Sequence, residues 1–265
     1  MLDYAFMQRA LAAALVIGLV GGVLGFFVVL RRLAFIGVGI SHSAIGGVAL
    51  GILVGVNPLW SGALFALGVA LGIAALGRRV EVGRDAAIGV FFSGAMALGV
   101  VLFGLQRGAR QELFGYLFGN VLAISNLELL VVSCLAAGLL GAVAFFFHEL
   151  LFVAYDEEIA RAYGHRVAWL DRLLLVLLAA AVVVGVRLVG VLLIEALLVV
   201  PAATAALWAM HWRGQLALSA LLAVVSGVGG LVFAYALDLA AGGTIALVAV
   251  ALFFLSLAAR GRMRS

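Results

Sequence analysis

The sequence predicts an all-α, polytopic membrane protein, and its composition decides that class. Of the 265 residues, 67% are hydrophobic and 11% are charged, and the mean hydropathy is +1.33. A soluble domain of this composition could not cover its surface with polar groups. The 34 glycines fit the same class, because small residues let membrane helices approach closely. We expect one transmembrane domain over residues 1–265.

Apolar runs predict about nine transmembrane helices, since a span takes roughly 20 residues. They cover about residues 10–30, 34–54, 58–77, 86–105 and 127–147, two spans within 173–212, and then 216–237 and 244–259. Pro58 suits the first position of its helix, where a missing N–H costs nothing.

Glycines at helical spacing predict close packing in the first two spans. The first carries two such pairs, Gly18/Gly22 and Gly21/Gly25. The second carries Gly47, Gly51 and Gly55, each four residues after the last.

Residues 106–126 interrupt this pattern with polar side chains around a short apolar core. The core is too short to cross a bilayer. A re-entrant or surface half-helix over about residues 112–123 is therefore expected.

A polar helix is expected at about residues 155–165, within otherwise apolar sequence. Asp156 can cap its start, Glu157 and Glu158 complement the positive end of the helix dipole, and Gly164 can supply a left-handed stop.

This polar helix also has an apolar face, because Ile159 and Tyr163 are four residues apart. Arg161 lies between them. Two interpretations are open: a connector lying on the lipid surface, or a docking helix on which a soluble partner acts.

The arginines predict the orientation of the chain. On a count of nine spans, 12 of the 16 fall on one side. These are Arg31, Arg32, Arg78, Arg79, Arg84, Arg161, Arg166, Arg172, Arg213, Arg260, Arg262 and Arg264, against Arg9, Arg107, Arg110 and Arg187 on the other. The positive-inside rule then places the polar helix and the C-terminus in the cytoplasm and the N-terminus outside.

The residue types also exclude some functions. The sequence contains no lysine, so it has no phosphate-binding GxxxxGK[ST] loop and cannot hydrolyse ATP by that route. The high pI of about 9.8 reflects arginines in short loops between spans, and we expect no nucleic-acid binding. We also expect no disulfide within the chain, which has one cysteine, Cys134.

Two ionisable residues stand inside expected spans, His42 in the second and Glu195 in the seventh. A charge at that depth costs at least about 2.5 kcal/mol, so a functional role is the default interpretation. Structural alternatives are a neutral His42 bonded to a carbonyl, and a Glu195 that is protonated or paired with Arg187. Imidazole and carboxylate together suit zinc, manganese and iron. Pro201, just past Glu195, predicts a helix kink.

Five segments, in order along essentially the whole chain, resemble the permeases of zinc/manganese-type (ABC-3 family) metal-ion ABC importers. They are Phe27–Gly37 with Ile40–Ser43, Tyr116–Ser125, Asp156–Gly164, Val189–Leu193 with Leu197–Ala205, and Leu237–Leu239 with Gly243–Ile245.

The resemblance implies a type II (metal-chelate-type) importer permease in a bacterial cytoplasmic membrane. Its implied partners are a second copy of the chain, a cytoplasmic ATPase dimer that hydrolyses ATP, and an extracytoplasmic metal-binding protein. No cofactor is implied, and Zn²⁺ or Mn²⁺, or alternatively iron, is the transported ion. The polar helix would be the coupling helix seated in the ATPase.

The sequence departs from the family at one place. Family members with a described translocation site have an Asp four residues before the His of the second span, and Val38 stands there in this chain. The family usually has a small or hydroxyl residue where Glu195 stands. Our hypothesis is that Glu195 replaces the missing charge and forms a transient metal stop with His42 in each protomer.

Three other functions remain open. A self-sufficient secondary transporter could use Glu195 as a proton carrier, and would need neither ATP nor a partner on Asp156–Gly164. A permease for a metal chelate would need a wider cavity. A membrane enzyme is disfavoured, because the sequence lacks the H-E-x-x-H and G-x-S-x-G patterns.

Overall fold

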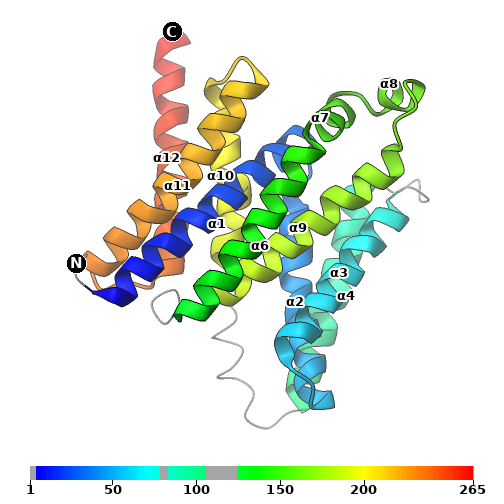
Figure 1. Ribbon diagram of the computed structural model, residues 1–265, viewed down its shortest axis with the longest axis vertical. Helices are drawn as coiled ribbons and strands as arrows, with labels where there is room; N and C mark the ends of the chain where they lie inside the picture. The colour runs from blue at the N-terminus through cyan, green and yellow to red at the C-terminus, as the bar shows by residue number, and fades with distance from the viewer. Residues whose placement is uncertain (1–3, 78–82, 106–123, 265) are drawn as a thin grey trace.

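The computed structural model describes residues 4–77, 83–105 and 124–264, and every regular element in those ranges is an α-helix (Figure 1). The long helices are α1 (Ala5–Leu30), α2 (Ala34–Val54), α3 (Pro58–Leu76), α4 (Arg84–Leu105), α6 (Asn126–Phe145), α9 (Val167–Val189), α10 (Val191–Trp208), α11 (Trp212–Ala236) and α12 (Ala241–Arg264). Two short helices, α7 (Phe147–Tyr155) and α8 (Glu157–Ala162), connect α6 to α9.

Eight of these helices are long and apolar enough to cross a membrane, and the shorter α10 is also apolar over Leu193–Trp208. Together they correspond to the nine expected spans, and α2 has the bounds that the sequence predicted. The first span begins earlier than expected, at Ala5, and the last continues to Arg264. The half-helix expected at about residues 112–123 lies outside the described residues.

The helices form two groups. In one, α1, α10, α11 and α12 pack against each other; in the other, α2, α3, α4 and α9 do so. The groups meet where α10 contacts α2 and α9, and α6 contacts α1 and α9. Figure 1 shows α1, α11 and α12 on the left, and α2, α3 and α4 at the lower right.

The two glycine pairs of α1 serve different neighbours. Gly18 and Gly22 lie against α11, and a Cβ on Gly22 would come within 2.6 Å of the Cα of Ala220. Gly21 and Gly25 lie against α10, and a Cβ on Gly25 would come within 2.1 Å of the Leu198 carbonyl oxygen. The predicted close packing is confirmed, and it buries α1 between two helices of its group.

Glycines also seat α2 against its neighbours. Gly47 and Gly51 lie against α3, and Gly55 ends α2 in the left-handed region with φ 76°. Pro58 occupies the first turn of α3, as predicted, and Asn57 caps the helix. These contacts place α2, which carries His42, in the interior of the protein.

The polar helix is shorter than expected, because α8 covers only Glu157–Ala162. The predicted roles of Asp156 and Gly164 are confirmed. The Asp156 side chain accepts hydrogen bonds from the backbone N–H groups of Glu158 and Ile159, and Gly164 has φ 84°. The preceding α7 was not predicted as a separate helix.

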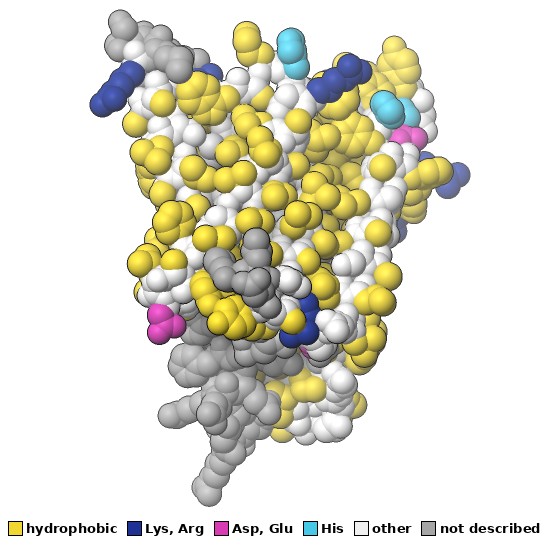
Figure 2. Space-filling view, turned by 60° about the vertical axis from the view of Figure 1, so that its left-hand side comes forward, with side chains coloured by type: hydrophobic (Ala, Val, Ile, Leu, Met, Phe, Trp, Pro, Cys, Tyr) yellow, Lys and Arg dark blue, Asp and Glu magenta, His cyan; other side chains and the backbone are white. Residues whose placement is uncertain are grey.

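Three of the segments that the arginine count assigned to one side lie toward one end of the protein. The end of α1, α8 and the C-terminus are all toward the upper end of Figure 1. Figure 2 shows one face with a broad band of hydrophobic side chains and with basic and histidine side chains at its upper end. This distribution suits a protein whose middle lies in lipid.

Candidate functional site

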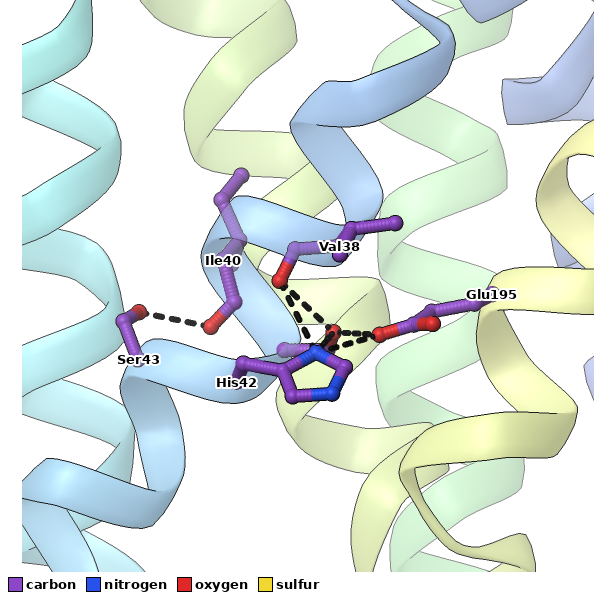
Figure 3. A network of polar contacts seen from close by, with 6 residues as sticks. Val38, Ile40, His42, Ser43 and Glu195 are labelled. Carbon is purple, nitrogen blue, oxygen red and sulfur yellow. Dashed lines mark hydrogen bonds and ion pairs between the residues drawn. The ribbon is translucent and has the colours of Figure 1, made fainter. Parts of the chain in front are cut away.

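His42 and Glu195 face each other between the two helix groups. His42 is carried by α2 and Glu195 by α10, and His42 Nδ1 lies 2.8 Å from Glu195 Oε1 (Figure 3). Both side chains are partly buried, with exposed fractions of 18% and 17%. The two intramembrane ionisable residues singled out in the sequence therefore form one cluster, and each retains some access for a small ion.

Ser41 is a third member of this cluster that the sequence analysis did not single out. Its hydroxyl donates a hydrogen bond to the same Glu195 Oε1, and it lies 3.2 Å from the Val38 carbonyl oxygen and 3.4 Å from His42 Nδ1. Glu195 Oε1 thus has two polar neighbours on α2. The signal was present as the run Ser41-His42-Ser43 in an apolar helix.

The surroundings of His42 favour one tautomer. Its Nδ1 faces three oxygens, those of Glu195 (2.8 Å), Val38 (3.2 Å) and Ser41 (3.4 Å). A proton on Nδ1 can be donated to them, and an ion that binds between His42 and Glu195 would take the place of that proton. The ring also makes an edge contact with Phe92 of α4, with centroids 5.3 Å apart.

Val38 cannot supply a carboxylate to this part of α2. Val38 provides a carbonyl oxygen to the cluster and an aliphatic side chain one turn before His42. The carboxylate comes instead from the facing helix α10. Ser43, by contrast, donates to the Ile40 carbonyl oxygen at 2.6 Å within its own helix.

The pair is small for a resident metal site. In the described part of the chain, no group of three or more His, Cys, Asp or Glu side chains could hold a metal ion. Structural zinc sites use four protein ligands. One imidazole and one carboxylate therefore suit an ion that passes rather than one that stays.

Pro201 lies inside α10, beyond Glu195 and in the same helix. Because proline has no N–H, the carbonyl of Leu197 lacks its usual partner in the helix. This oxygen faces α1, 3.3 Å from the position that a Cβ on Gly21 would occupy. The kink predicted at Pro201 stays a prediction.

The residues proposed for coupling lie together on α8 and in the turn that follows it. Ile159 and Tyr163 are both exposed, as are Glu158 and Arg161. Glu157 differs, because its carboxylate forms an ion pair with Arg31 at the end of α1. α8 therefore exposes both apolar and charged side chains. It is far from His42 along the sequence.

The chain is similar to known proteins over nearly its whole length. A model of the ABC 3 transport family matches residues 3–260. The manganese transport system membrane protein MntC of Listeria monocytogenes is 35% identical over 256 residues, which are 97% of this chain and 91% of that protein. The high-affinity zinc uptake system membrane protein ZnuB of Haemophilus influenzae is 33% identical, over 96% of this chain and 97% of that one.

Two solved structures are similar as well. PsaBC from Streptococcus pneumoniae in complex with Fab contains a chain with a TM-score of 0.83 and 35% identity, covering 96% of this chain and 91% of that chain. A metal-chelate type ABC transporter in an inward-facing conformation gives a TM-score of 0.76 at 17% identity, with 94% and 85% covered. The second likeness bears on the fold alone, and it agrees with the metal-chelate-type fold expected from the sequence.

Proposed function

This chain belongs to the ABC 3 transport family, and we propose that it is the permease through which an ATP-binding-cassette importer passes a divalent transition metal ion into the cytoplasm. The relatives named for manganese and for zinc support a metal cargo. The observation that carries the proposal is the 2.8 Å contact between His42 Nδ1 and Glu195 Oε1, in the interior and between two helix groups.

The donor types at this contact fit the cargo. Imidazole nitrogen and carboxylate oxygen both bind zinc, manganese and iron, and in vivo selection among them depends on geometry, availability and the delivering protein. We propose Zn²⁺ or Mn²⁺ as the transported ion. His42 and Glu195 act as its transient ligands in each protomer, with Ser41 holding the carboxylate toward α2.

Weak binding is what a transport path needs. An ion must enter the site readily and also leave it, so two protein ligands serve better than four. His42 and Glu195 belong to different helix groups, α2 to one and α10 to the other. Relative movement of the groups therefore changes the distance between the two ligands, and the ion is held in one arrangement and released in the other.

We further propose that α8 is the coupling helix. Its exposed Ile159 and Tyr163 would seat in a cytoplasmic ATPase subunit, with Asp156, Glu157, Glu158, Arg161 and Gly164 shaping and orienting the segment. The full transporter would contain two copies of this chain, an ATPase dimer that hydrolyses ATP, and an extracytoplasmic metal-binding protein. In a bacterial cytoplasmic membrane the N-terminus would be outside and the C-terminus inside.

The experiment is uptake by the reconstituted complex. The chain would be purified with its ATPase and binding protein, placed in proteoliposomes, and assayed for uptake of zinc and of manganese with and without ATP. We expect uptake of at least one metal that needs ATP and is lost in His42→Ala. His148→Ala is the control, because His148 is exposed on α7, outside the cluster.

Two results would contradict the proposal. Uptake that follows a proton gradient and persists without ATP would identify a secondary carrier centred on Glu195. ATP-dependent uptake that is unchanged in His42→Ala would keep the importer but remove this pair from the metal path.

A further inference from the structure

Arg31 at the end of α1 is the centre of a second charged cluster. Its side chain is only 3% exposed, although it lies at the arginine-rich end of the protein. Its Nη1 lies 2.7 Å from Asp171 Oδ1 near the start of α9, and its Nη2 forms an ion pair with Glu157 Oε1 at the start of α8. One side chain thus joins three helices.

The burial of Arg31 and Asp171 distinguishes this ion pair from an ordinary surface salt bridge. Asp171 is 4% exposed and Glu157 is 35% exposed, so the Arg31–Asp171 pair is withdrawn from water and Glu157 reaches in toward it. A buried charge is tolerated only when it is paired and well hydrogen-bonded. The planar guanidinium presents separate nitrogens to the two carboxylates, a geometry that lysine cannot reproduce.

Glu157 is distinct from its neighbours on α8. Glu158 and Arg161 are exposed, whereas Glu157 turns toward Arg31. Ala160 of α8 is also fully buried. The carboxylate of Glu157 is therefore the polar attachment of α8 to the end of α1.

The end of α1 is joined to α2 by a tight turn. The backbone N–H of Leu33 donates to the Val28 carbonyl at 2.8 Å, and the N–H of Arg32 donates to the Val29 carbonyl at 3.1 Å. Arg32 has φ 56°, as in a Schellman turn, and Leu33 is buried. His42 follows eight residues into α2, about 12 Å along the helix.

We propose that Arg31 is a positioning residue that links α8 to the metal path. It fastens α8 to the α1–α2 junction, so that a displacement of α8 by the ATPase moves the helix that carries His42. Asp171 holds the guanidinium in place from α9, and Glu157 transmits the displacement. This inference rests on the proposed function, because it takes α8 as the ATPase docking helix.

The sharpest test compares Glu157→Gln with Glu149→Gln in the reconstituted complex. Both remove one negative charge from the short helices between α6 and α9, but only the first removes a carboxylate that pairs with Arg31. We expect Glu157→Gln to retain ATP hydrolysis while the number of metal ions moved per ATP falls about fivefold or more. Glu149→Gln should keep the wild-type ratio, and equal ratios for the two variants would overturn the inference.

A double-mutant cycle separates this role from direct contact between Glu157 and the ATPase. If Glu157 acts through Arg31, then Arg31→Gln/Glu157→Gln should have the ratio of the more severe single variant. If the two losses multiply, Glu157 acts independently and the inference is wrong. Arg31→Lys, which keeps the buried charge without the fork, covers the case in which Arg31→Gln does not fold.

Hydrogen exchange gives a readout that does not depend on transport. In the complex, Glu157→Gln should speed amide exchange in Glu157–Gly164 and in residues 31–36 relative to Glu149→Gln. Unchanged amide exchange would overturn the proposed link between Arg31 and α8, even if the wild-type complex transports metal. If the wild type lacks ATP-dependent uptake, the proposed function fails, and exchange still decides whether Arg31 fastens α8.

Discussion

Glu195 Oε1 lies 2.8 Å from His42 Nδ1, so the side chains of two helices from different groups meet in the interior. Each side chain alone would be costly at this depth. Together they lie within hydrogen-bond distance of each other and place two metal-binding atom types in one cluster. Three predictions follow from the details of this contact.

Glu195→Gln should lower metal uptake at limiting metal concentration by at least about tenfold, on the scale of losses seen when a partner of a metal-binding histidine is removed. The amide keeps the size of the side chain and can still meet His42 and Ser41, but it lacks the negative charge. Initial uptake rates over a range of manganese and zinc concentrations would measure this loss of uptake. Glu149→Gln on α7 is the control, and wild-type rates for Glu195→Gln would end the idea that this carboxylate is a ligand.

Ser41→Ala should have a smaller effect in the same direction. The hydroxyl donates to Glu195 Oε1, and a hydrogen bond to a charged group contributes about 1.5–3 kcal/mol. Without this hydrogen bond, the Glu195 carboxylate can move away from α2. Metal uptake should therefore fall at limiting metal concentration. Ser43→Ala is a matched control, because Ser43 donates to the Ile40 carbonyl instead. Equal uptake by the two alanine variants would show that Ser41 does not orient Glu195.

Val38→Asp should rescue Glu195→Gln. Val38 precedes His42 by one turn on α2, so an aspartate there shares a face with the histidine. The double variant restores one carboxylate beside His42, and uptake should recover toward the wild-type rate. Val38→Asn in the same background supplies the shape without the charge and should not rescue. Rescue by both, or by neither, would mean that the charge at this place is not what the ion needs.

Much of the fold was predictable because each membrane-spanning helix can be identified from its own length and apolar composition. The sequence therefore predicted α2 with its observed bounds. The caps of α8 were also predictable, since Asp156 and Gly164 act within a few residues. The sequence could not divide the helices into two groups, because that depends on which apolar faces meet.

The sequence identified two residues of the candidate site, but it could not predict which residues contact each other there. His42 and Glu195 stood out because ionisable residues are rare inside spans. Their contact, and the part played by Ser41, depend on the approach of α10 to α2. The sequence analysis used Arg31 only in the arginine count and did not single out Asp171, because a charge near a span end ordinarily faces water. Only tertiary packing buries both.

Ile159→Asp should weaken binding of the ATPase to the permease. Ile159 is 48% exposed on α8, where an apolar side chain gains by being covered. Burying such a side chain is worth about 1.5–3 kcal/mol, so the dissociation constant should rise by about tenfold or more. Titration of the ATPase against the permease in nanodiscs would measure it. His148→Ala is the control, because His148 is exposed on α7, outside the coupling segment. An unchanged affinity for Ile159→Asp would move the docking surface elsewhere.

Gly25→Ala should destabilise the fold by about 1–3 kcal/mol, the usual cost of overpacking a close contact. The added Cβ would lie 2.1 Å from the Leu198 carbonyl oxygen, which is backbone and cannot rotate away, so α1 and α10 must separate. Because α10 carries Glu195, the same separation should also loosen the contact with His42. Gly138→Ala on α6 is the control, since a Cβ there meets no atom within 4 Å. Thermal unfolding in detergent should show a lower midpoint for Gly25→Ala alone, and equal midpoints would mean that α1 and α10 are not held this closely.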